Sequence, residues 1–329
     1  MNDNKKEAFR AQFRNPPAGM RGAPFWAWNC DLEREELMRQ IPYFREMGFG
    51  GFHIHVRSGL STPYMGEEYR NLISDCVDEA GKQGLIPRLY DEDRWPSGFA
   101  GGLVVKAHPE YRRRWLRVAK EPLANAHMDI GRYTVSRNPD GTLAAYRRLS
   151  PNEPAAGEVW FAQIQTEADS ERYNNSAYVD NLNPEAVRTF LQMTHEKLKE
   201  RLGDRFGTVA PSIFTDEPQL GRECAVPNVE QAPEVRLVWT DDFADTLFAS
   251  SGVRIEDVLP ELIWDLPGGA PSRGCTTTTL PSGSRRHIPI RLEHGASGTV
   301  SISRGTPARS RLCGCRHGRP EKPCVFIVT

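Results

Sequence analysis

The sequence has no long hydrophobic run, no excess charge of either sign and no cysteine pattern of a disulfide scaffold. None of its apolar stretches reaches the roughly 18 residues that a transmembrane helix needs. Among 329 residues, 42 Lys and Arg balance 43 Asp and Glu, giving a net charge of -1, which argues against a nucleic-acid or membrane-surface partner for the chain as a whole. Seven cysteines, an odd number in a long chain, do not indicate paired disulfides.

Two further absences narrow the class of protein. Residues 1–19 are polar and contain no apolar signal-peptide core, so we expect a cytoplasmic location. No glycine-rich phosphate-binding motif lies between a strand and a helix, so we expect no nucleotide, and we predict no cofactor at all. The composition, 39% hydrophobic and 26% charged, is that of a globular protein with one large domain or two ordinary ones.

Residues 267–329, here called the basic tail, differ from the rest. They contain ten Lys and Arg but only two acids, Glu293 and Glu321, so the tail carries +8 and residues 1–266 carry -9. Four of the seven cysteines and a single aromatic residue, Phe326, lie in the tail. It shows no helical or strand period, and we expect low order there.

Several interpretations of the basic tail stay open. The three alternatives are a disordered basic segment, a nucleic-acid-binding tail, and the product of a reading-frame error. The run of threonines at 276–279 favours the frame error, because repeated ACT codons read one register over give TAC, which encodes Tyr. A zinc site built on Cys313, Cys315, His317 and Cys324 fits poorly, since the first two are separated by one residue instead of two to four.

Residues 1–109 alternate strand and helix patterns. We expect strands at 23–29, 51–56 and 85–91 and helices at 33–47 and 67–82. This β-α-β-α-β order favours parallel strands with crossover helices.

The pattern then changes. Four segments, at 115–119, 133–137, 142–149 and 159–165, read as antiparallel strands, so we predict a β-rich insertion over 110–175. Asn183 and Pro184 then open a helix, a fourth core strand follows at 208–215, and another helix lies near 241–250. The predicted fold class is α/β, with the barrel strands at 1–109 and 176–266 separated by that insertion.

Side chains suited to chemistry follow each core strand. Because parallel α/β barrels place their active sites at the carboxyl ends of the strands, we expect these side chains to share one edge. The candidates for substrate binding are Trp26, Trp28, Asn29, His53, His55, Arg57 and Trp95. The candidates for catalysis are Asp91, Glu92, Asp93, Asp216 and Glu217.

The carboxyl groups suggest glycoside hydrolysis. That reaction needs two carboxyl groups astride the scissile bond, one of them protonated at neutral pH through burial or a neighbouring acid. The clusters at 91–93 and 216–217 supply such groups, although loop or helix-cap roles are the alternative for Asp91, Asp93 and Asp216.

The histidines and tryptophans have more than one interpretation. His53 and His55 are two apart on a strand and therefore face the same side. Three roles are open for them: zinc binding, hydrogen bonding with sugar hydroxyls, and packing as buried structural residues. Trp26, Trp28 and Trp95 provide flat faces on which sugars stack, and of the first two we expect one to stack and the other to pack in the core.

The run YDEDRWPSGFAGG at 90–102 resembles a signature of alpha-L-rhamnosidase-like glycoside hydrolases, family 106 and its relatives. The segments PFWAWN at 24–29, GGFHIH at 50–55 and IFTDEPQ at 213–219 are similar to the same group, and the resemblance covers roughly residues 20–265. It implies a (β/α)8 TIM-type barrel that acts on polysaccharide, with Glu217 as the catalytic acid and a second catalytic carboxylate on a later strand.

The chain departs from that family in its strand count. Four core strands precede residue 267 where a barrel requires eight, so we expect an incomplete barrel that is poorly soluble and inactive as written. Two other functions stay open: a non-catalytic carbohydrate-binding barrel, and a metal-dependent barrel hydrolase that uses His53 and His55. As partner we expect a carbohydrate substrate, with no nucleic acid and no membrane.

Overall fold

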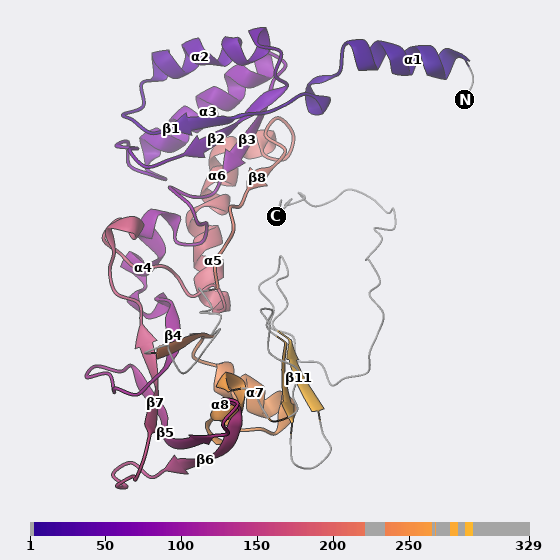
Figure 1. Cartoon of the computed structure of the whole chain (residues 1–329). Helices are drawn as coiled ribbons and strands as arrows, with labels where there is room; N and C mark the ends of the chain where they lie inside the picture. The colour runs from indigo at the N-terminus through magenta and orange to yellow at the C-terminus, as the bar shows by residue number, and fades with distance from the viewer. Residues whose placement is uncertain (1–2, 221–233, 265–266, 268–276, 282–286, 292–329) are drawn as a thin grey trace.

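The structure is a computed structural model that describes residues 3–220, 234–264, 267, 277–281 and 287–291 (Figure 1). It is a mixed α/β structure with a four-stranded parallel sheet and a five-stranded antiparallel sheet, beside a separate pair of strands. In Figure 1 the two larger sheets lie at opposite ends of the molecule.

The parallel sheet has the strand order β1-β2-β3-β8. Its strands are β1 (Phe25–Trp28), β2 (Gly51–Val56), β3 (Ile86–Tyr90) and β8 (Ile213–Phe214), and the first three are connected by α2 (Arg34–Glu46) and α3 (Glu67–Lys82). The predicted β-α-β-α-β order and the parallel pairing are confirmed. Strand β8 is shorter than predicted, because the backbone N–H groups of Val209 and Ala210 bond to the carbonyl of Arg205 instead of to a neighbouring strand.

The two faces of the parallel sheet have different surroundings. One face packs against α2, α3 and α6 (His195–Leu202), in a core that includes Trp26, Trp28, Phe52, Ile54, Leu89 and Leu198. We call the other side the histidine face, and it consists of Phe25, His53, His55, Tyr90 and Phe214. This division follows from the two-residue period of a strand. Phe25 is 52% exposed on the histidine face.

A small helical unit follows the parallel sheet. It contains α4 (Leu103–Ala107) and α5 (Pro184–Met193), which pack with a cluster of Phe99, Val104, Tyr173, Tyr178 and Phe190. As the sequence predicts, Asn183 caps α5 by accepting the backbone N–H groups of Glu185 and Ala186. Helix α5 ends at Met193 and α6 begins at His195, because the backbone of Thr194 leaves the regular helical geometry.

The antiparallel sheet has the order β6-β5-β7-β4-β9. Its strands are β4 (Arg114–Ala119), β5 (Met128–Arg137), β6 (Leu143–Leu149), β7 (Val159–Thr166) and β9 (Glu234–Trp239). The first four match the β-rich insertion, whereas β9 was not predicted. Strand β9 with α7 (Phe243–Ser251) and α8 (Ile255–Ile263), which the sequence assigns to the continued barrel, packs in the core of this sheet instead.

No closed barrel is present in the part of the chain that the structure describes. The four parallel strands form an open sheet, because the segment after β8 leads to the antiparallel sheet and adds no further parallel strand within the described ranges.

Part of the basic tail is described. It forms one antiparallel pair of strands, β10 (Thr277–Pro281) and β11 (His287–Arg291), where the sequence showed no strand period. The residues of the poorly fitting zinc site, at 313, 315, 317 and 324, lie outside the described residues.

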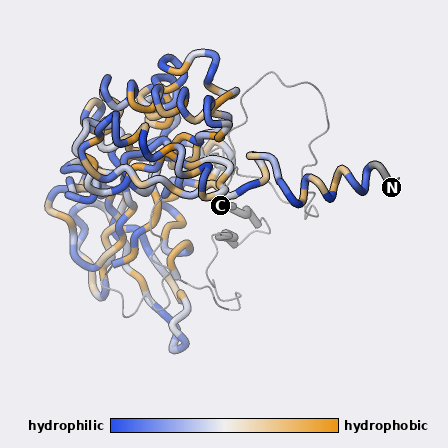
Figure 2. Tube along the Cα trace, turned by 90° about the horizontal axis from the view of Figure 1, so that it is seen from above, coloured by the Kyte–Doolittle hydropathy of each residue, from blue (hydrophilic) through white to orange (hydrophobic). Residues whose placement is uncertain are grey.

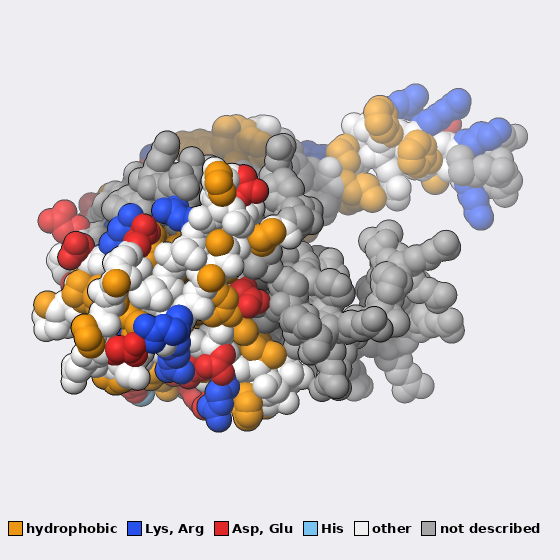
Figure 3. Space-filling view, turned by 60° about the horizontal axis from the view of Figure 1, so that its bottom comes forward, with side chains coloured by type: hydrophobic (Ala, Val, Ile, Leu, Met, Phe, Trp, Pro, Cys, Tyr) orange, Lys and Arg blue, Asp and Glu red, His pale blue; other side chains and the backbone are white. Residues whose placement is uncertain are grey.

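Helix α1 (Asp3–Arg14), which the sequence did not predict, extends away from the rest of the described chain (Figures 1 and 2). Its surface carries both basic and hydrophobic side chains (Figure 3), and Phe9 and Phe13 are 63% and 81% exposed. Of the helices that the structure describes, none combines the length and apolar character needed to cross a bilayer.

Candidate active site

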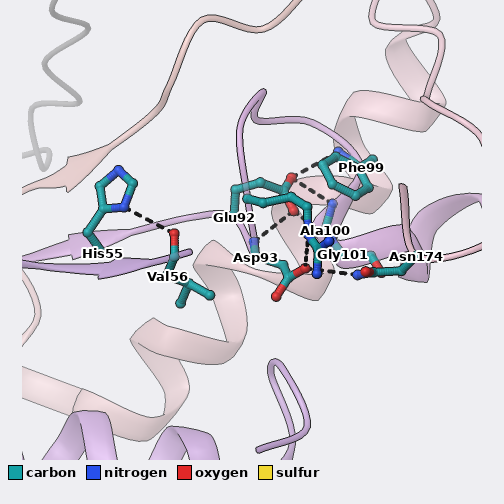
Figure 4. A network of polar contacts seen from close by, with 9 residues as sticks. His55, Val56, Glu92, Asp93, Phe99, Ala100, Gly101 and Asn174 are labelled. Carbon is teal, nitrogen blue, oxygen red and sulfur yellow. Dashed lines mark hydrogen bonds and ion pairs between the residues drawn. The ribbon is translucent and has the colours of Figure 1, made fainter. Parts of the chain in front are cut away.

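The segment that follows β3 folds around the carboxylate of Glu92. This side chain is fully buried and accepts the backbone N–H groups of Asp93, Gly98, Phe99, Ala100 and Gly101 at 2.6–3.0 Å (Figure 4). Burial raises the pKa of Glu92, while the amide donors act in the opposite direction. These five hydrogen bonds to one carboxylate therefore hold the loop at 92–101 in its folded form.

Glycines allow this loop to close. Gly98 has φ of 129°, and a Cβ there would lie 2.7 Å from the Asn181 side-chain oxygen. Gly101 and Gly102 also adopt positive φ, with values of 62° and 92°. The glycines of the thirteen-residue run thus have a conformational reason, since other residues rarely adopt such backbone angles.

Asp91 lies at the end of β3 with no exposed surface. Its Oδ1 accepts the Ser97 hydroxyl at 2.7 Å, and its Oδ2 accepts the Thr215 hydroxyl at 2.6 Å. Burial raises the pKa of Asp91 to about 7, against the effect of these two hydroxyl donors. The carboxyl group therefore ties β3 both to the following loop and to the end of β8.

Asp216 follows β8 and is partly buried, with a side chain 16% exposed. Its Oδ2 lies 3.5 Å from the Tyr90 hydroxyl and 3.9 Å from Nε2 of His55. Burial raises the pKa of Asp216, and the neighbouring charge of Glu217 raises it further, while Arg57 lowers it. The predicted residue Arg57 is itself exposed, and its charge acts on Asp216 and His55.

Glu217 is exposed and has a left-handed backbone, with φ of 45°. Its Oε2 accepts the indole N–H of Trp95 at 3.0 Å. The guanidinium of Arg172 lies 4.8 Å from the centre of the Trp95 ring. Trp95 thus joins the loop after β3 to the carboxylate after β8.

The two histidines of β2 lie on the same face, as predicted. Both rings contact Phe25 and Phe214, and the His55 ring stacks on Tyr90 at a centroid distance of 4.1 Å. Nδ1 of His53 lies 3.2 Å from the Ala23 carbonyl. Burial lowers the pKa of His53, and it lowers the pKa of His55 to about 4.

Among the described residues, neither histidine belongs to a cluster of side chains that could hold a metal ion. Over the described ranges, no group of three or more His, Cys, Asp or Glu side chains is placed to hold a metal ion.

The structure separates the remaining candidates. Trp26 and Trp28 are both buried against the helices, on the face opposite the histidines. Their burial contradicts the expectation that one of them stacks on a sugar, because residues two apart on a strand face the same side. Asn29 is exposed at the end of β1. Asp93 is buried, with its Oδ2 2.9 Å from Nε of Arg94 and 2.8 Å from Nδ2 of Asn174.

Three residues of the site were not among the candidates from the sequence. Ser97 and Thr215 carry the hydroxyl groups that bind Asp91. His195, which lies at the start of α6 and not at a strand end, has its Nε2 3.6 Å from Oδ2 of Asp91. Ser97 and Thr215 lie close in sequence to the acidic clusters, which was a usable signal. The position of His195 depends on how α6 packs.

Comparison with solved structures shows a distant likeness. No family profile matches the chain, and no curated protein sequence matches it. Among solved structures, the chain is similar to a rhamnosidase from Novosphingobium sp. PP1Y, with 10% sequence identity and a TM-score of 0.45 over 78% of this chain. The match covers 42% of that protein, so the chain spans less than half of its length.

Proposed function

We propose that this chain is part of the catalytic domain of a glycoside hydrolase, which breaks O-glycosidic bonds with carboxyl groups at the ends of β3 and β8. The observation that carries the proposal is the contrast between two consecutive carboxyl groups. Asp216 is partly buried beside Tyr90 and His55, whereas Glu217 is exposed beside Trp95.

Burial divides the five candidate carboxyl groups into two sets. Asp91 and Glu92 have no exposed surface and Asp93 is 3% exposed, so none of the three is placed to contact a sugar. Asp216 and Glu217 reach the surface. We therefore assign contact with the substrate to Asp216 and Glu217 and structural roles to the other three.

The surroundings also separate the roles of Asp216 and Glu217. Hydrolysis requires one protonated carboxyl group to protonate the departing oxygen and one ionised carboxylate to assist attack at the sugar carbon. Burial and the charge of Glu217 both raise the pKa of Asp216, so Asp216 retains its proton to higher pH. Asp216 is then the proton donor and Glu217 the carboxylate, although the family resemblance by itself points to Glu217 as the acid.

For the substrate we propose an alpha-L-rhamnoside. The support for this finer assignment is the resemblance of residues 90–102, whose loop brings Trp95 to Glu217 and Ser97 to Asp216. Phe25 adds an exposed apolar surface on the histidine face, and aromatic surfaces suit the apolar side of a 6-deoxy sugar.

The test compares the unaltered chain with Asp216→Asn and Glu217→Gln on a panel of aryl glycosides that includes an alpha-L-rhamnoside. Turnover by the unaltered chain would refute the inactivity expected of an incomplete barrel. We expect each variant to lose turnover by about 100-fold or more, which is the scale of an acid–base contribution. Because a good leaving group needs no proton, Asp216→Asn should retain more activity on a dinitrophenyl glycoside than on a phenyl glycoside. If the Glu217 carboxylate attacks the sugar directly, added azide should restore turnover to Glu217→Gln, because azide then attacks the sugar carbon in its place and the aryl group departs.

The matched control is Asp242→Asn, which changes an exposed carboxylate before α7 and should leave turnover unchanged. If the unaltered chain binds sugars but hydrolyses none of the panel, the chain is a carbohydrate-binding module instead of an enzyme. If Asp216→Asn and Glu217→Gln exchange their expected responses, Glu217 is the acid.

A further inference from the structure

His195 belongs to α6, one of the helices that pack against the parallel sheet. It is the first residue of α6, its side chain is 13% exposed, and its Nε2 lies 3.6 Å from Oδ2 of the fully buried Asp91. This separation is slightly longer than a hydrogen bond, so a small rotation of either side chain brings the two atoms into bonding distance. Nothing in the sequence pattern near His195 indicates this contact.

The hydrogen-bond partners of Thr194 fix the tautomer of His195. The Thr194 hydroxyl donates its only hydrogen to the carbonyl of Phe190 at 2.7 Å. Toward Nδ1 of His195, 3.0 Å away, that oxygen is therefore an acceptor, and Nδ1 must carry the hydrogen. In a neutral imidazole, Nε2 is then a bare acceptor that points at another acceptor, Oδ2 of Asp91.

The other partners of Asp91 do not supply the missing hydrogen. The Ser97 hydroxyl accepts the backbone N–H of Asp216 and donates to Oδ1 of Asp91, and the Thr215 hydroxyl donates to Oδ2. Two buried acceptors that face each other cost free energy unless a proton lies between them.

We propose that Asp91 and His195 share a single proton as a buried pair, and that this pair positions Asp216 and Glu217 through Ser97 and Thr215. The positioning role rests on the proposed glycoside hydrolase function, whereas the shared proton does not. His195 is a positioning residue, since it reaches the reacting groups only through Asp91.

The surroundings of the pair agree with a neutral state. Burial raises the pKa of Asp91 to about 7 and lowers the pKa of His195 to about 4, so below pH 7 the proton belongs to the carboxyl group. The charged or titratable groups that interact with the pair are Glu92, Asp216, Glu196, Tyr64 and Tyr90. Of these, Asp216 raises the pKa of Asp91 further, because two carboxylates repel.

The first measurement needs no activity. Nitrogen-15 NMR of the full chain labelled at histidine reports the tautomer and charge of each ring, and the His195 signals are those absent from His195→Gln. We expect Nδ1 protonated and Nε2 unprotonated, without ionisation of the ring between pH 5 and pH 7. A protonated Nε2 at pH 6, or a ring that ionises near its ordinary pKa of about 6.5, would show that Asp91 does not donate the proton to Nε2 of His195 and would overturn the proposal.

The second measurement tests the positioning role. We expect His195→Phe, which keeps a ring but removes the acceptor, to lower kcat by about tenfold with KM changed less than about twofold. His195→Gln, whose amide can still accept from Asp91, should recover most of the rate. The control is His108→Gln, which alters a histidine with a side chain 42% exposed that pairs with Glu110, and it should not change the rate.

The outcomes separate the two proposals. If the unaltered chain hydrolyses no glycoside, the proposed function fails, while the NMR result still decides the shared proton. If the chain is active and His195→Phe retains full kcat, the positioning role is wrong, whatever the tautomer.

Discussion

Ser97 and Asp216, which are 119 positions apart, bind each other twice. The backbone N–H of Ser97 donates to the carbonyl of Asp216 at 2.8 Å, and the backbone N–H of Asp216 donates to the Ser97 hydroxyl at 2.8 Å. The same hydroxyl donates to Asp91. One serine thus fixes the end of β8 relative to the end of β3, and with it the two carboxyl groups that we assign to the reaction.

Replacing this hydroxyl tests its contribution to stability. In Ser97→Ala, Asp91 loses a donor in a buried setting, and the N–H of Asp216 loses its acceptor in a partly buried one. We expect the free energy of unfolding to fall by about 1–3 kcal/mol, measured by urea denaturation at pH 6. Ser136→Ala, at an exposed serine of β5, is the control and should change it by less than about 0.5 kcal/mol. Equal effects of the two substitutions would show that the Ser97 hydroxyl has no special role.

The carboxylate of Glu92 should be still more sensitive. Glu92→Gln replaces one of its two acceptor oxygens with an NH2 group, which faces backbone N–H donors and cannot accept from them. We expect a loss of at least about 2 kcal/mol in the free energy of unfolding, together with faster proteolysis within residues 92–102. Glu200→Gln removes an exposed charge from α6 and serves as the control. Retained stability in Glu92→Gln would mean that the loop does not depend on the carboxylate.

The raised pKa of Asp91 predicts a specific pH dependence. Because folding favours the protonated form, Asp91 stabilises the protein most below its unfolded pKa of 3.8, and this contribution is lost as pH rises toward the folded pKa of about 7. Asp91→Asn cannot titrate, so the stability of the unaltered chain relative to this variant should decline between pH 4 and pH 7 and level off above. The decline is at most about 4 kcal/mol. Urea denaturation of both proteins at pH 4, 5.5, 7 and 8.5 measures it, and a constant difference would contradict a raised pKa.

Local patterns were sufficient for the parallel half of the fold. Strand β2 and helix α3 have the predicted bounds, because a two-residue and a 3.6-residue period are properties of the local sequence. Strand β9 was missed because it pairs with β4 far earlier in the chain, and residues 234–239 show no feature that names that partner.

The sequence indicated which residues of the candidate site lie near one another better than it indicated which contacts they make. The acids, histidines and Trp95 do gather at the ends of neighbouring parallel strands, as such a sheet requires. Their sequence spacing did not show that Glu92 is enclosed by amides, since that depends on the backbone turning back at Gly98 and Gly101. The contact of His195 with Asp91 depends on the break at Thr194, which orients the first residue of α6.

The charge of Arg57 provides a test of which carboxyl group donates the proton. Arg57 lowers the pKa of Asp216 and Glu217 raises it, so Arg57→Gln should raise the pKa of Asp216 and Glu217→Gln should lower it. If Asp216 is the acid, the alkaline limb of the kcat profile moves to higher pH in Arg57→Gln, because the proton is retained longer. Carbon-13 NMR of the Asp216 carboxyl group follows the same shift without turnover, and Arg45→Gln, an exposed arginine of α2, should leave both unchanged. If the NMR titration moves as expected while the kcat limb stays in place, another group donates the proton.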